Sequence, residues 1–224
     1  MPQGQITPES PFGQWLQRLA GHPGVKTILD IGTWNGMGST LCLALAVGRR
    51  SDVNQCDILS VEANPVMWRT AVENWANLDC SGNEALARGS KRLRITQGRI
   101  AKTMMSKEDI EQHPLFETVR EHAQRWFAQD VLDFFQAPLL RVPPRVDLAV
   151  LDGGEFADDF TEVIRVRPLF LALDDTKTLK NYKTIRALDK DGGYRRLAGG
   201  DDRNGWAVYE RIDTKEVALD GWGC

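Results

Sequence analysis

Short, mostly apolar segments recur along this chain of 224 residues, and longer segments with helical spacing separate them. Five of these segments predict strands, four of them apolar runs at residues 25–31, 58–61, 146–151 and 169–173, and one with alternating polarity at 92–96. Apolar residues at helical spacing predict helices that begin near residues 11, 39 and 64, and a longer helix between 115 and 134. Strands and helices therefore alternate along most of the chain.

Two further runs, 194–197 and 206–211, flank the turn sequence GGDDRNG and predict an antiparallel strand pair. Alternating strands and helices form βαβ units, which build a mostly parallel sheet covered on both faces. We therefore expect an α/β fold. It is a doubly wound, mostly parallel seven-stranded sheet with helices on both faces and a C-terminal antiparallel strand pair.

One main domain is expected at 25–212, preceded by a tail and helix at 1–24 and followed by a tail at 213–224. Within it, 99–145 is a long crossover between two strands. The first part of this crossover, 100–114, is irregular and forms either a lid over the ligand crevice or a surface connection. The polar stretch at 80–89, which contains Gly and Ser, is expected to be a loop.

Composition and charge narrow the class of protein. Apolar residues make up 42% and charged residues 26%, which is ordinary for a globular domain, and the net charge of −3 does not favour nucleic acid. No apolar stretch approaches the roughly 20 residues that span a membrane, and the N-terminus does not resemble a secretion signal. The four cysteines and three histidines lack zinc-site spacing. We expect a cytoplasmic protein with reduced thiols and no membrane or nucleic-acid partner.

Acidic residues end four of the five predicted parallel strands: Asp30, Glu62, Asp152 and the pair Asp174 and Asp175. In such sheets the ligand binds outside the carboxyl ends of the strands. A carboxylate at that place does not pair into the sheet. We therefore expect these acids to be exposed to one crevice.

The most specific motif is LDIGTWNGMGST at residues 29–40, which lies between the first strand and the next helix. Its pattern D-x-G-x-x-x-G-x-G places Gly32, Gly36 and Gly38 in a turn after Asp30. The turn is wider than the dinucleotide fingerprint, and its acid would repel a pyrophosphate at the helix N-terminus. The motif therefore favours a ligand with a cationic head, which a backbone without side chains approaches closely.

This motif, with an acid at the end of the second strand, resembles the class I S-adenosylmethionine-dependent methyltransferases over roughly 25–212. The resemblance implies a Rossmann-like methyltransferase fold and S-adenosylmethionine as cofactor, with the methionine ammonium near Asp30 and the ribose hydroxyls on Glu62. The cofactor-binding residues implied by the resemblance are Asp30, Gly32, Thr33, Trp34, Gly36, Gly38, Ser39, Glu62 and Gly98. The alternatives are an ordinary strand-to-helix turn, a helix-start charge at Glu62 and a packing role for Trp34.

Three carboxylates, Asp152, Asp174 and Asp175, end the fourth and fifth predicted strands. Their mutual repulsion is costly unless a cation or protons intervene, and Mg²⁺ prefers oxygen ligands. The arrangement resembles the divalent-metal-dependent small-molecule O-methyltransferases of the catechol and antibiotic-sugar types. That resemblance implies that the three carboxylates bind Mg²⁺, which activates an acceptor hydroxyl. Helix capping by Asp175, a solvated turn at Asp152 and a metal-free catalytic acid are the alternatives.

The sequence departs from these relatives at Glu155. They place a Lys or His as general base three positions after the first metal-binding Asp, where this chain has Glu155. We take Asp152 and Glu155 as the candidate catalytic residues, with first-turn helix charge as the alternative role of Glu155. Asp158 and Asp159 follow on the same predicted helix and are expected to be solvated. Lys180 follows the acidic pair and either meets an anionic substrate or belongs to an exposed helix face.

The leading hypothesis is an S-adenosylmethionine-dependent methyltransferase that uses Mg²⁺ to methylate a hydroxyl of a small acceptor, such as a sugar or secondary metabolite. A nucleic-acid or protein methyltransferase, a nucleotide-binding oxidoreductase and a non-catalytic binder with the same fold are the alternatives. The mild negative charge and the sequence DGG after the fourth strand disfavour the nucleic-acid enzyme. A homodimer is expected on the fold class alone.

Overall fold

The computed structural model describes residues 5–212, without the side chains of residues 118, 119, 124 and 191. Residues 1–4 of the predicted N-terminal tail and the whole predicted tail at 213–224 lie outside the described residues. One seven-stranded sheet has the order β3-β2-β1-β4-β5-β7-β6. Its strands are β1 (Thr27–Ile31), β2 (Asp57–Glu62), β3 (Leu93–Gln97), β4 (Leu148–Leu151), β5 (Phe170–Asp174), β6 (Tyr194–Gly200) and β7 (Trp206–Arg211).

The sheet is parallel from β3 to β5, and the last two strands are antiparallel, β7 against β5 and β6 against β7. The helices are α1 (Pro11–Gly21), α2 (Ser39–Arg49), α3 (Pro65–Ala76), α4 (Glu84–Ser90), α5 (Lys107–Glu111), α6 (Phe116–Gln136), α7 (Asp159–Val163) and α8 (Leu179–Asp191). Short 3₁₀ turns lie at Val53–Gln55 and Ile164–Val166. The predicted fold class is confirmed. The order reverses between β1 and β4, which is where such sheets bind ligands.

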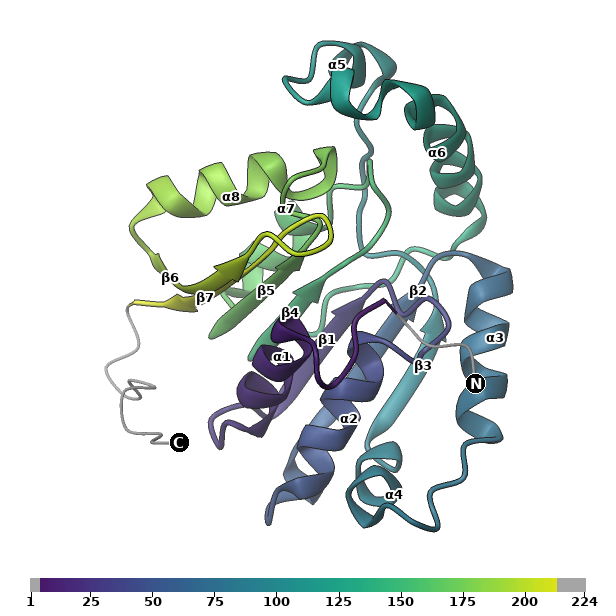
Figure 1. Cartoon of the computed structure of the whole chain (residues 1–224), viewed down its shortest axis with the longest axis vertical. Helices are drawn as coiled ribbons and strands as arrows, with labels where there is room; N and C mark the ends of the chain where they lie inside the picture. Colours follow the sequence, from purple (N-terminus) through teal and green to yellow (C-terminus); the bar gives the residue numbers. More distant parts are fainter. Residues whose placement is uncertain (1–4, 213–224) are drawn as a thin grey trace.

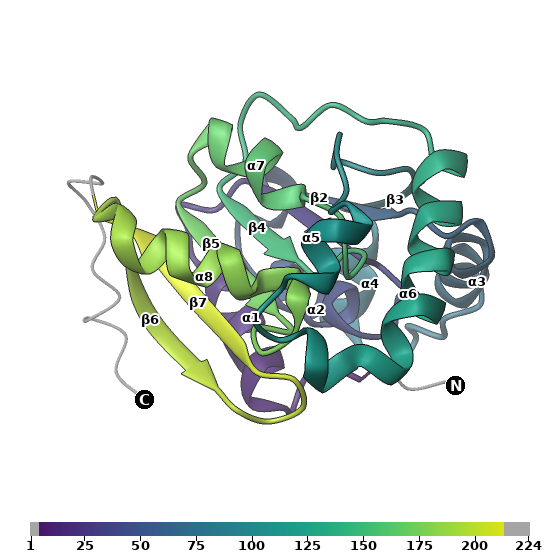
Figure 2. The ribbon, with the colours of Figure 1, turned by 90° about the horizontal axis from the view of Figure 1, so that it is seen from above.

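Alternate residues of the central strands pack on opposite faces of the sheet. Ile28, Val150 and Phe170 belong to the apolar core that also contains α1 and α2. Their neighbours Leu29 and Leu151 belong to a second core, shared with α7 and α8. Figure 2 shows α1 and α7 on opposite sides of the sheet. Because both faces are buried, the strands carry continuous apolar runs, and this made them easy to predict from the sequence.

The N-terminal helix is part of the main core. Ser10 caps α1 by accepting a hydrogen bond from the backbone N–H of Gly13. Phe12 and Leu16 are buried, and the Phe12 ring stacks on Trp206 of β7 at 5.4 Å between centroids. Packing against the last strand thus joins α1 to the main domain.

The segment predicted as a loop at 80–89 ends in a helix, α4, so that prediction is wrong for its second half. The Asn83 side chain accepts a hydrogen bond from the N–H of Leu86 and starts the helix. Two glycines then let α4 lie directly on α2. A Cβ on Gly48 would come within 1.7 Å of the Ala85 carbonyl oxygen, and one on Gly89 within 1.9 Å of the Ala44 oxygen. One of the two glycines in this stretch, Gly89, therefore serves helix packing.

The long crossover carries α5 and α6, which form an arch beyond one end of the sheet (Figure 1).

Among the described residues, no helix is long and apolar enough to cross a membrane. Cys42, Cys56 and Cys80 are free thiols, and Cys224 lies outside the described residues. The cytoplasmic location stays a prediction.

The contact between α2 and α4 leads to a test of stability. Gly48→Ala places a methyl group against the Ala85 carbonyl, so the helices must separate. We expect the free energy of unfolding to fall by about 1–3 kcal/mol in denaturant titrations. Gly21→Ala is the matched control, since a Cβ at this helical glycine meets no atom within 4 Å. If both variants are equally stable, α4 does not pack as described.

Candidate functional site

A cavity of about 620 Å³ lies at the carboxyl ends of β1, β2, β4 and β5, with α6 forming part of its wall. Eleven of the predicted site residues line it: Gly32, Thr33, Trp34, Gly38, Ser39, Glu62, Gly98, Asp152, Glu155, Asp174 and Asp175. Two others, Asp30 and Gly36, do not line the cavity. The structure thus gathers most of the predicted residues around one space.

The glycine loop between β1 and α2 is held at its start by the neighbouring strand. The backbone N–H groups of Gly32 and Thr33 both donate to the Val61 carbonyl of β2, at 2.9 and 3.2 Å. Gly32 has φ +93°, and a Cβ there would come within 1.9 Å of the Asp152 carbonyl oxygen. Glycine is therefore required at position 32, because the loops after β1 and β4 touch at this point.

Trp34 lies at the tip of the glycine loop with φ +51°, an unusual conformation for a tryptophan. Its side chain is 60% exposed and borders the cavity. Most of the Trp34 side chain is therefore not packed against the protein, contrary to the packing role considered from the sequence. An exposed aromatic ring at the rim is available to a ligand.

Asp30 is fully buried on the α2 side of β1 and is not exposed to the crevice, contrary to the expectation from the sequence. Its carboxylate accepts hydrogen bonds from the hydroxyls of Ser39 (2.9 Å), Thr40 (2.7 Å) and Ser60 (2.7 Å). Burial raises the pKa of Asp30, and these three hydroxyls partly offset that effect. Since α2 begins at Ser39, Asp30 anchors the helix N-terminus and the loop before it. The structure therefore gives Asp30 a positioning role.

Glu62 ends β2 and lies on the cavity wall, only 8% exposed. Its two carboxylate oxygens accept hydrogen bonds from the backbone N–H groups of Trp34 (2.6 Å) and Asn64 (2.8 Å). Burial raises the pKa of Glu62 to about 7, although these two bonds lower it. A carboxylate has about four acceptor positions, so Glu62 retains capacity for ligand hydroxyls beyond the two bonds that hold the loop.

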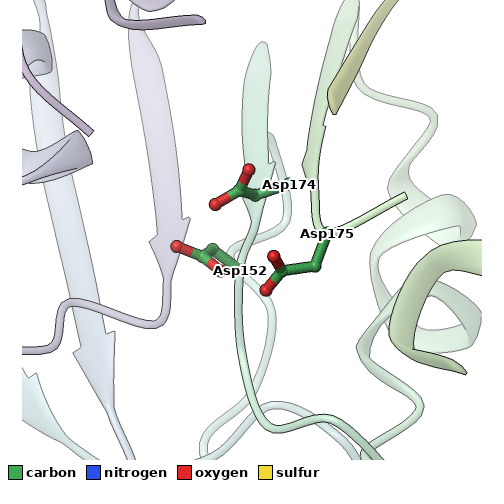
Figure 3. A group of neighbouring side chains, drawn as sticks. All are labelled: Asp152, Asp174 and Asp175. Carbon is green, nitrogen blue, oxygen red and sulfur yellow. The ribbon is translucent and has the colours of Figure 1, made fainter. Parts of the chain in front are cut away.

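The three predicted metal ligands lie together at the ends of β4 and β5. Asp152, Asp174 and Asp175 each offer an oxygen within 4.8 Å of the others, and Figure 3 shows their carboxylates turned toward a common space. Asp174 is almost fully buried, whereas the sequence suggested exposure to the crevice. Burial, together with Asp175, raises the pKa of Asp174, while Arg203 and Lys180 act in the opposite direction.

Two side chains that the sequence did not assign to the cluster supply its positive charge. The Lys180 ammonium lies 2.9 Å from an Asp152 oxygen and 2.8 Å from an Asp175 oxygen. The Arg203 guanidinium pairs with Asp174. Burial alone would lower the pKa of Lys180, but Asp152, Asp175 and Glu155 raise it well above the usual lysine value. The expectation of an exposed helix face is therefore wrong for Lys180, whose side chain is 11% exposed.

The oxygen ligands of the cluster are of the type that binds a divalent cation, but in this structure they are already paired with other side chains. Carboxylate oxygens are the ligands that Mg²⁺ prefers. However, the Lys180 ammonium lies between two of the carboxylates, and Arg203 pairs with the third. A divalent ion would have to displace Lys180 to reach Asp152 and Asp175 together. The predicted Mg²⁺ stays a prediction.

Glu155 serves as a cap for α8 rather than standing free in the cavity. One carboxylate oxygen accepts from the backbone N–H groups of Leu179 (2.8 Å) and Lys180 (3.3 Å), and the other accepts from the Thr178 hydroxyl (3.1 Å). A side chain that holds a helix N-terminus is poorly placed to move a proton. This geometry gives Glu155 a structural role in place of the general base considered from the sequence.

Residues of α6 form a wall that the sequence did not predict. Trp126, Asp130 and Asp133 line the cavity from this helix. Asp130 accepts a hydrogen bond from the Phe156 N–H (3.1 Å), and Asp133 accepts from the Asn64 side chain. Helical spacing indicated that α6 packs on the protein, but spacing does not indicate which residues of a crossover helix face a distant strand end.

The segment at 100–114 lies beside the cavity instead of covering it as a lid. The N–H of Met105 donates to the Phe156 carbonyl at 2.9 Å, and Met104 forms a bridge with Ala157. The segment borders a second cavity of about 430 Å³ behind the 153–157 loop. Asp159, expected to be solvated, is buried and accepts from the N–H of Ala101 at 2.9 Å.

No protein-family model and no curated protein matches the chain. Among solved structures, cofactor-bound Rv0187 from MTB is 16% identical with a TM-score of 0.53, covering 94% of this chain and 84% of its own. A methyltransferase from Geobacter sulfurreducens is 11% identical with a TM-score of 0.52, covering 92% and 81%. An O-methyltransferase from Bacillus cereus, in complex with SAH, is 15% identical with a TM-score of 0.50, covering 90% and 81%.

This chain has the class I methyltransferase fold. The predicted Rossmann-like methyltransferase architecture is thereby confirmed. The roles of individual residues stay predictions, because the identities of 11–16% establish the architecture alone. The cavity lies at the switch point between β1 and β4, where ligands bind in doubly wound sheets.

The capping role of Glu155 can be measured as stability. Glu155→Ala removes the acceptor for two backbone N–H groups of α8, so we expect the free energy of unfolding to fall by about 0.5–2 kcal/mol. Glu155→Gln keeps an amide oxygen and should lose less. Glu117→Ala, at an exposed pair on α6, is the control and should change stability by less than about 0.5 kcal/mol. Equal stability of all three variants would contradict the cap.

Proposed function

We propose that this protein is an S-adenosylmethionine-dependent methyltransferase that methylates a hydroxyl of a small acceptor, such as a sugar or secondary metabolite. The observation that carries this proposal is that one cavity contains both a cofactor cradle and a polar cluster. The cradle consists of the glycine loop and Glu62, and the cluster lies at the ends of β4 and β5. The methyltransferase fold supports the same proposal.

Each half of the cavity has a distinct task in this proposal. The backbone of the glycine loop would hold the aminoacyl part of the cofactor, and the Glu62 carboxylate would accept hydrogen bonds from the ribose hydroxyls. The bound cofactor supplies an electrophilic methyl group on a sulfonium. The Asp152 carboxylate, on the cavity wall, would accept the proton of the acceptor hydroxyl, and the methyl group would come from the cofactor.

The charge of the cavity supports a neutral or cationic acceptor. Carboxylates outnumber cations on its wall, since the acids include Glu62, Asp130, Asp133, Asp152 and Asp174, whereas the cations are Arg99, Lys180 and Arg203. The carboxylates of the cavity would repel a phosphate-rich acceptor wherever its phosphates did not contact one of these three cations. This argues against the nucleic-acid alternative. Carboxylates also accept hydrogen bonds from sugar hydroxyls, which fits a polyhydroxylated acceptor.

Binding of S-adenosylhomocysteine, measured by calorimetry, tests the cofactor half. We expect micromolar binding by the wild-type protein. Glu62→Ala should weaken it by about 10–100-fold, because charge-assisted hydrogen bonds contribute about 1.5–3 kcal/mol. Glu73→Ala, at an exposed position on α3, is the matched control and should bind normally. Absence of binding by the wild-type protein would contradict the proposal, and binding without turnover on any hydroxylated acceptor would favour a non-catalytic binder.

The raised pKa of Glu62 makes cofactor binding dependent on pH. Ribose hydroxyls donate better to the carboxylate than to the neutral acid, and Glu62 ionises near pH 7. We therefore expect affinity for S-adenosylhomocysteine to rise from about pH 6 to pH 8 and then level off. The contribution of Glu62 to the free energy of unfolding should change in the opposite direction. Because the folded pKa exceeds the usual glutamate value of 4.5, the Glu62 contribution falls as pH rises from 4.5 to about 7. An affinity independent of pH would contradict the role of Glu62.

A further inference from the structure

Lys180 is held in the acid cluster by its backbone as well as by its side chain. It lies in the first turn of α8, where its N–H donates to Glu155, the residue that caps the helix. Its ammonium donates to Asp152 at 2.9 Å and to Asp175 at 2.8 Å. Glu155 therefore sets the start of α8 so that Lys180 projects between these two carboxylates. The position of the Lys180 ammonium is therefore fixed by the surrounding structure.

The second cation of the cluster comes from the β6–β7 hairpin. The turn at 201–205 folds back over the end of β5, where the N–H of Thr176 donates to the Gly205 carbonyl and that of Lys177 to the Asn204 carbonyl. Arg203 then reaches Asp174, and the Asn204 side chain donates to Asp175 at 3.0 Å. Each of the three carboxylates thus has at least one donor from the chain itself.

We propose that the Lys180 ammonium is the resident cation of this cluster, so that the site works without a divalent metal ion. This inference rests on the proposed function for its meaning in catalysis. Together with Arg203, Lys180 supplies the positive charge that makes three neighbouring carboxylates tolerable. An ammonium has three N–H donors, and two are used by Asp152 and Asp175, which leaves one for the acceptor oxygen. That bond would stabilise negative charge on the oxygen as Asp152 takes its proton.

The proposal makes the metal and the lysine mutually exclusive. Both need the space between Asp152 and Asp175, and a Mg²⁺ ion placed there would meet the Lys180 ammonium. Lys180→Gln removes the ammonium from between Asp152 and Asp175, while Arg203 still pairs with Asp174. The substitution should therefore create the metal site that the cluster only resembles in the wild-type protein.

Binding of Mn²⁺ alone to the full chain, followed by calorimetry and electron paramagnetic resonance, tests this. We expect wild-type protein to show no saturable site below about 1 mM. Lys180→Gln should bind one Mn²⁺ at least about tenfold more tightly, whereas Lys180→Arg, which keeps the charge, should not gain affinity. Lys190→Gln, at an exposed position of the same helix, is the matched control and should behave as wild type. Micromolar Mn²⁺ binding by wild type, or no gain in Lys180→Gln, would overturn the proposal.

A second variant covers the case in which Lys180→Gln leaves too much buried negative charge to fold. Lys180→Gln combined with Asp175→Asn removes one charge of each sign and keeps an oxygen donor at position 175. It should also bind Mn²⁺ more tightly than wild type, and the lack of a gain would again overturn the proposal. Titration of the same samples with S-adenosylhomocysteine separates the two hypotheses, because loss of cofactor binding concerns the proposed function and Mn²⁺ binding concerns Lys180.

Discussion

The arrangement of the site depends on one buried carboxylate, that of Asp30. It accepts hydroxyl hydrogen bonds from Ser39 and Thr40 at the start of α2 and from Ser60 in the middle of β2. An unpaired charge at this depth would be very costly, so the three donors must stay close, and they bring the helix start and two strands with them. The glycine loop is thereby fixed at both ends. The ligand side of the loop is thus determined by a residue that does not face the ligand.

The acidic residues near the ends of the strands are stabilised by different kinds of partner. Glu62 uses its oxygens to hold the backbone of Trp34 and Asn64, and Glu155 uses its oxygens to hold the start of α8. Carboxylates in the cluster are instead paired with Lys180 and Arg203. The same residue type therefore serves as a backbone anchor, a cap or part of an ion network. The difference lies in which donors the neighbouring elements present.

The sequence predicted the strands and the cavity-lining glycine loop well, because buried parallel strands carry continuous apolar runs and a wide Gly turn has few other uses. It did not predict α4, since the polar stretch at 80–89 contains Gly and Ser, and the contact of Gly89 with α2 is not visible in the sequence. Nor did it place Lys180 or Arg203 in the cluster. Both come from segments that follow β5. Their side chains contact the acids because of the way these segments fold, which residue spacing along the sequence does not reveal. Exposure was also misjudged for Asp30 and Asp174, because a strand-end acid is buried when donors surround it.

The hairpin that carries Arg203 has a consequence for the order in which the site is completed during synthesis. The acids of the cluster are all present once residue 175 has been made, but their cations follow only at residues 180 and 203. A nascent chain that stops before the β6–β7 turn would hold Asp174 without its guanidinium partner. Because β7 also pairs with β5, closure of this edge of the sheet and pairing of Asp174 with Arg203 both depend on the same hairpin.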